Sequence, residues 1–156
     1  MCKTKSFLLV FILLFLTLGM KIECRRKPTK KMVLDKCAKR MEIKFPPSTH
    51  LVNFAEDWDL DYSACVRIEI DENDLQAFID NSPFAGKRLE ARSNLSAIGP
   101  AKWWEDHESV QNLKSGQVRL QSGGPEGLSI LIDLDKPGKA VVYLEYMGRP
   151  IIFQDE

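Results

Sequence analysis

The sequence has few of the residues and motifs on which catalysis and metal binding usually depend. It contains two histidines, His50 and His107, and neither lies near a nucleophile motif such as G-x-S-x-G. Its four cysteines, at positions 2, 24, 37 and 65, form no C-x-x-C pair, and no histidine is spaced to complete a zinc site with them. We therefore predict no catalytic residue, no metal ligand and no cofactor.

Two other binding motifs are incomplete. The run DWDLD at 57–61 matches the start of a calcium-binding EF-hand loop, but the loop would need glycine at 62 and glutamate at 68. The chain has Tyr62 and Ile68 there. The glycine-rich run 122–125 lacks the lysine and the following helix of a phosphate-binding loop. These stretches are typical of an acidic loop and a turn.

Long apolar runs are absent except at residues 7–20 (FLLVFILLFLTLGM), which follow Lys3 and Lys5 as in a secretory signal. A helix of this length would be about 21 Å long, short of the roughly 30 Å hydrocarbon core of a bilayer. Residues 1–20 are therefore expected to be a signal peptide, cut before Met20, or an uncleaved membrane anchor. Either fate predicts an exported protein that is periplasmic, extracellular or membrane-anchored.

Basic and acidic residues are equal in number, 22 of each, but they are unevenly placed. Residues 21–45 form a basic juxtamembrane segment, and residues 46–156 form an acidic domain. The segment fits contact with an anionic membrane surface, at about 1 kcal/mol for each Lys or Arg, or a solvated spacer. The positive-inside rule would hold it in the cytoplasm, which opposes export. The acidic domain argues against nucleic acid as a partner.

Alternating and helical patterns predict the domain's elements. Residues 62–70, 118–120, 128–134 and 140–147 are expected strands, the last two forming an antiparallel hairpin across Lys136-Pro137-Gly138. Met41–Phe45 and 151–153 are expected as brief extended segments. Residues 30–41 and 71–80 have helical spacing.

The order of these elements predicts an α+β fold. We expect an antiparallel sheet of about four strands, with one or two short helices packed on one face and the other face wet. Cys37 and Cys65 are either bonded to each other, which requires an oxidising compartment, or separate free thiols.

Trp103, Trp104 and His107 form the most unusual local run, because carboxylates stand beside them. An exposed tryptophan is a good contact anchor, so these three residues are the candidate binding surface. The alternative is that both tryptophans pack, one on each side of a connector.

Residues 43–79 resemble small uncharacterised bacterial exported proteins and lipoproteins. In those proteins a segment similar to FPPSTHLVNF precedes a strand similar to SACVRIEI, and a helix similar to DLQAFI follows. Val142-Tyr143-Leu144 resembles their closing hairpin. The chain lacks the lipobox of the lipoproteins, and the resemblance implies localisation and fold rather than an activity.

Together these features predict a non-enzymatic binding module of the cell envelope, exported or membrane-tethered, whose partner is an unknown protein or envelope ligand. The alternative is a small hydrolase using His107 and its neighbouring carboxylates.

Overall fold

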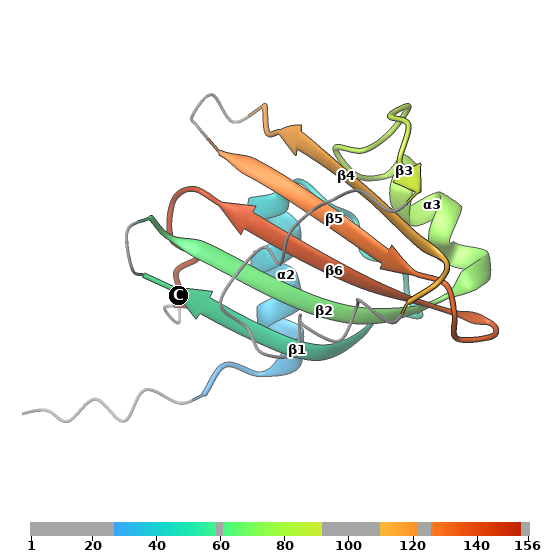
Figure 1. Cartoon of the computed structure of the whole chain (residues 1–156). Coiled ribbons are helices and arrows are strands. Elements are labelled where there is room, and N and C mark those ends of the chain that lie inside the picture. Colours follow the sequence, from blue (N-terminus) through green and yellow to red (C-terminus); the bar gives the residue numbers. More distant parts are fainter. Residues whose placement is uncertain (1–26, 59–60, 92–109, 122–125, 154–156) are drawn as a thin grey trace, which may run out of the picture.

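A computed structural model of the chain describes residues 27–58, 61–91, 110–121 and 126–153 (Figure 1). Within these residues, six strands form one antiparallel sheet in the order β1-β2-β6-β5-β4-β3. The elements are α2 (Lys30–Met41), β1 (His50–Asp57), β2 (Ser63–Asp71), the 3₁₀ turn η1 (Glu72–Asp74), α3 (Leu75–Asp80), β3 (Glu90–Ala91), β4 (Leu113–Arg119), β5 (Gly127–Asp133) and β6 (Lys139–Met147).

The α+β class is confirmed, but the prediction of about four strands is wrong, because β1 and β3 were not expected. The predicted strand near 118–120 runs instead over Leu113–Arg119. Neither of the expected brief segments is a strand. Met41 belongs to α2, the chain turns at Glu42, and neither residues 43–45 nor residues 151–153 pair with a strand of the described sheet.

Several predicted elements are confirmed. Both expected helices are present, and β2 lies within one residue of its expected bounds. The hairpin of β5 and β6 has the expected antiparallel pairing, with Ile132 opposite Val142. Alternation and turn residues thus located these elements correctly.

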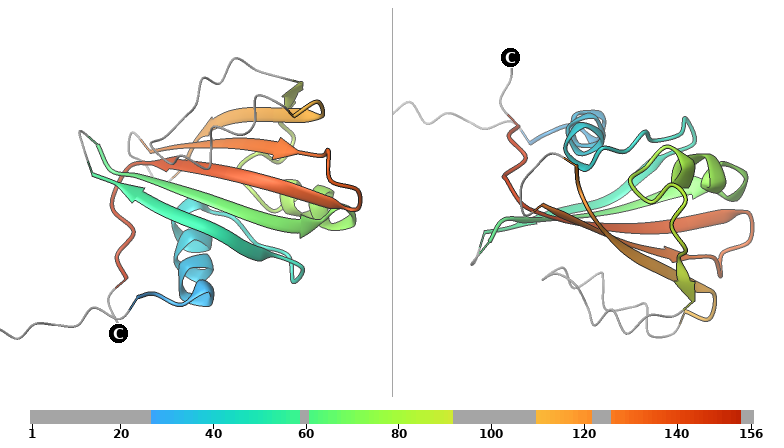
Figure 2. Two further views of the ribbon diagram at one scale, coloured as in Figure 1. Left: turned by 60° about the horizontal axis from the view of Figure 1, so that its bottom comes forward. Right: turned by 90° about the horizontal axis from the view of Figure 1, so that it is seen from above.

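The main core lies between the sheet and its two helices, which share one face of the sheet (Figure 2). Alternate side chains of β2, including Val66 and Ile68, pack there with Phe78 of α3. Helix α2 contributes Val33, Cys37 and Met41 to the same cluster. The hydrophobic core therefore includes residues upstream of position 46.

The second face of the sheet is buried in part, whereas β2 led us to expect a face that is wet throughout. Val110, Leu113, Leu131, Val141 and Tyr143 form a second buried cluster there. On this face Arg67 lies over the Tyr143 ring at 5.2 Å, a cation–π contact. The prediction was based on polar residues of β2, which suggested that this face meets water. The neighbouring strand β6, however, is buried on both faces.

Cys37 and Cys65 are separate free thiols. Cys37 belongs to the core on the helix side, whereas Cys65 alternates with Ala64 and Val66 and so points to the other face. The sheet therefore separates the two sulfur atoms. Burial raises the pKa of each thiol to about 12, which keeps both protonated and unreactive at neutral pH.

Glu145 is a buried carboxyl group on the second face, only 3% exposed, and no described residue forms a hydrogen bond with its Oε2 atom. Burial raises its pKa from 4.5 to about 7. At a pH between these two pKa values, Glu145 keeps its proton in the folded protein but has released it in the unfolded chain. Stability from this group is therefore highest at low pH and falls as the pH rises toward 7.

We expect Glu145→Gln to stabilise the fold by about 2 kcal/mol at about pH 8, and to have little effect at about pH 4. Urea unfolding of both proteins at the two pH values measures this difference. Glu90→Gln, at an exposed carboxylate of β3, is the matched control and should show no such pH dependence. An equal effect of Glu145→Gln at both pH values would contradict the assignment.

Candidate binding cleft beside helix α2

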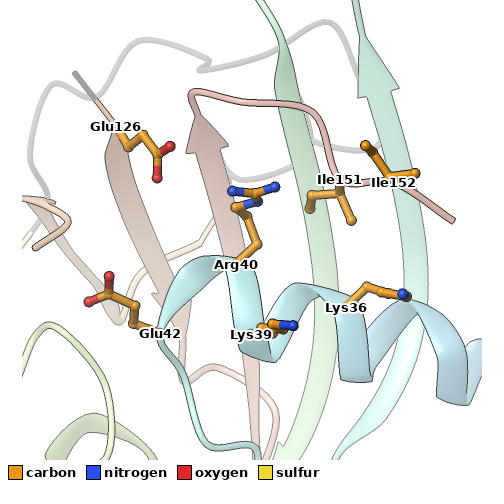
Figure 3. A pocket seen from close by; sticks show the side chains of 7 residues that line it. All are labelled: Lys36, Lys39, Arg40, Glu42, Glu126, Ile151 and Ile152. Carbon is orange, nitrogen blue, oxygen red and sulfur yellow. The ribbon is translucent and has the colours of Figure 1, made fainter. Parts of the chain in front are cut away.

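A cleft of about 270 Å³ lies between helix α2 and the segment that follows β6. Figure 3 shows its side chains, with three cations on α2 and two isoleucines on the opposite segment. The lining residues are Lys36, Lys39, Arg40, Glu42, Glu126, Ile151 and Ile152.

Helix α2 forms the first wall of the cleft. A cap at each end and a row of buried side chains hold the helix in place. The Thr29 hydroxyl accepts a hydrogen bond from the amide of Met32 at 3.2 Å, which caps the helix at its start. At the other end Glu42 adopts a left-handed conformation with φ 56°, and its amide bonds to the carbonyl of Ala38. With Val33, Cys37 and Met41 turned to the core, Lys36 and Arg40 share the flank that faces the cleft.

The second wall is the chain from Gly148 to Ile152. The amide of Gly148 donates to the carbonyl of Tyr62 at 3.1 Å, and the amide of Arg149 donates to the Tyr146 hydroxyl at 3.0 Å. Arg40 then joins the two walls, because its Nη2 donates to the carbonyl of Pro150 at 3.1 Å. These bonds fix the width of the cleft.

A buried carboxylate lies at one end of the cleft. Glu126 is 1% exposed, and its Oε1 accepts from Nε of Arg149 at 2.6 Å. Arg149 itself is exposed and lies at the surface. The ion pair largely neutralises Glu126, so this carboxylate cancels little of the positive charge on α2.

Two cations of the cleft remain available to a ligand. Among the described residues, no carboxylate pairs with Lys36 or Lys39. Beside them Ile151 is buried, whereas Ile152 is 58% exposed. The cleft therefore presents ammonium groups next to an exposed apolar side chain, which suits a ligand with an anionic part and an apolar part.

The described lining residues include no serine, threonine, cysteine or histidine. Nucleophilic catalysis normally uses one of these side chains beside a base, or an activated lysine in a desolvated pocket. Lys39 is exposed, so its surroundings are hydrated. Elsewhere in the described residues, no group of three or more His, Cys, Asp or Glu side chains is placed to hold a metal ion. The described lining residues offer a ligand charged and apolar contacts.

Trp103, Trp104 and His107, the binding surface predicted from the sequence, fall within 92–109, outside the described residues. The prediction about them stays a prediction. Residues 1–20 also lie outside the described part, and no helix within that part is long and apolar enough to cross a membrane.

Sequence reasoning identified Lys36, Lys39 and Arg40 only as members of a basic segment. It missed Glu126, Ile151 and Ile152, because no local pattern links them to α2. The Arg40–Pro150 bond joins residues 110 positions apart. The one available signal was the short apolar run 151–153 after the last strand.

We compared the chain with models of protein families, with curated proteins and with solved structures, and no match was found in any of the three comparisons.

Proposed function

We propose that this protein is a non-enzymatic binding module of the cell envelope, exported or membrane-tethered, and that the cleft beside α2 is its binding surface. One observation carries the proposal: Lys36 and Lys39, unpaired within the described residues, stand beside the exposed Ile152 on a rigid framework. Such a surface can bind a ligand without any reacting group.

The proposed location is supported by the apolar run 7–20, with Lys3 and Lys5 before it, and by the basic segment 21–45 after it. The resemblance of residues 43–79 to small exported bacterial proteins points the same way. Intact mass and fractionation of the natively expressed protein test the location. A mass starting near Met20 in a soluble exported fraction, or a full-length mass in membranes, would support it, whereas a full-length cytosolic protein would refute it.

Binding is tested by immobilising the full-length protein and quantifying the envelope lipids and proteins that it retains. We expect Lys36→Glu/Lys39→Glu to lose about tenfold of at least one component, equivalent to about 1.4 kcal/mol. The control Lys114→Glu/Lys136→Glu makes the same charge change on β4 and on the β5–β6 turn. If no component distinguishes the cleft variant from this control, the cleft is not the binding surface.

A further inference from the structure

We propose that the cleft docks on an anionic lipid bilayer, with Lys36, Lys39 and Arg40 at the phosphate groups and Ile152 at the boundary with the acyl chains. We call these four residues the docking face. The inference rests on the proposed function, because it identifies the partner of the same cleft. Three independent features of the chain favour a bilayer over a soluble ligand.

The first feature is charge. Residues 27–42, which include α2 and its C-cap, contribute Lys27, Lys30, Lys31, Lys36, Lys39 and Arg40 to the described chain, against Asp35 and Glu42. The rest of the domain is acidic. An anionic surface would therefore attract the domain by this side and repel the others, which selects one orientation.

The second feature is the position of the apolar side chain. Ile152 is one of three large hydrophobic residues that are highly exposed in the described chain, and it lies beside the two unpaired lysines. Lysine and an aliphatic side chain placed together match the layered chemistry of a membrane interface, where phosphates lie just outside hydrocarbon. A long lysine stem can follow the apolar part while its ammonium stays at the phosphates.

The third feature is the path of the chain. The described chain starts at Lys27 and ends at Phe153 on the same side of the domain (Figure 2). Residue 20, the end of the apolar run, is separated from Lys30 by ten peptide units, which span at most about 36 Å. An anchor at 7–20 would therefore hold α2 and Ile152 within reach of the bilayer surface, with the β5–β6 turn facing away.

The experiment uses the full-length protein reconstituted in vesicles of phosphatidylcholine alone, or of equimolar phosphatidylcholine and phosphatidylglycerol. Trace acetylation of lysines is followed residue by residue by mass spectrometry. In the anionic vesicles, we expect Lys36 and Lys39 to react about fivefold more slowly than in the neutral ones, and high salt to abolish the difference. Lys136, on the turn at the opposite end of β6, is the internal control and should react equally in both.

A charge variant checks that docking, rather than local chemistry at the lysines, causes the protection. In Lys36→Gln/Lys39→Gln, hydrogen exchange of the peptide 148–153 should become equal in the two kinds of vesicle. In the control Lys114→Gln/Lys136→Gln, exchange should stay slower on the anionic vesicles. Both variants change exposed or half-buried side chains, and thermal unfolding verifies that each remains folded.

The outcomes separate this inference from the proposed function. Equal acetylation in both vesicles, with the protein retained in each, would overturn docking while leaving the tether intact. Release of the protein from both vesicles would refute the tether and docking together. Protection of Lys36 and Lys39 by a soluble poly-glutamate peptide, but not by anionic vesicles, would replace the bilayer with an acidic protein segment as the partner.

Discussion

Met41→Ala should lower the free energy of unfolding by about 3 kcal/mol, because it removes a fully buried side chain from the contact between α2 and the sheet. The change leaves a cavity that neighbouring residues of the core fill only in part. Urea unfolding followed by circular dichroism measures the loss.

Lys31→Ala is the matched control, since it truncates an exposed side chain of the same helix. We expect it to change stability by less than about 0.5 kcal/mol. Equal stabilities of Met41→Ala and Lys31→Ala would show that α2 does not pack on the sheet. The first wall of the cleft would then be lost as well.

Gly148→Ala should also destabilise the protein by about 3 kcal/mol, through overpacking and backbone strain. A Cβ atom at this position would lie 2.6 Å from the Tyr146 hydroxyl and 2.7 Å from Cγ of Glu126. Both side chains are buried and bonded, so neither can move away cheaply. Ligand binding at the cleft should weaken together with stability, because Gly148 begins its second wall.

Gly138→Ala separates the contribution of strain from that of the clash. Gly138 also has a positive φ, 71°, but no atom of the described residues lies within 4 Å of its added Cβ. We expect this variant to lose only about 1 kcal/mol. If the two alanine variants have the same urea midpoint, the close contacts around Gly148 do not constrain the second wall.

The elements predicted from sequence are those whose signal is local. β2 and β6 alternate clearly, Lys136-Pro137-Gly138 specifies a turn, and α2 shows an apolar stripe among lysines. β1 was not predicted because most of its residues are half-buried, so buried and exposed positions do not alternate clearly along it. Its pairing with β2 also shifts in register between Leu51 and Asn53, which interrupts the alternation further. β3 is only two residues long and depends entirely on its partner β4.

Burial on the second face and the cleft could not be predicted for a different reason. Arg67 and Glu145 are polar residues that normally face water, yet Glu145 is buried and Arg67 stacks on Tyr143. The cleft depends on contacts between α2 and the chain after β6, at opposite ends of the domain sequence. Local patterns carry no information about such distant pairs.

The position of β6 has a consequence for how the protein is made. β6 is the last of the described strands along the chain, yet it lies inside the sheet between β2 and β5. Its pairing with β2 joins residues such as Asp71 and Lys139, which are 68 positions apart. Until β6 has left the ribosome, β1 and β2 lack the partner that completes their core, and such non-local pairing forms slowly. A nascent chain of this topology cannot complete its sheet before β6 is made, which would suit the export proposed above, because a narrow translocation channel accepts unfolded chains.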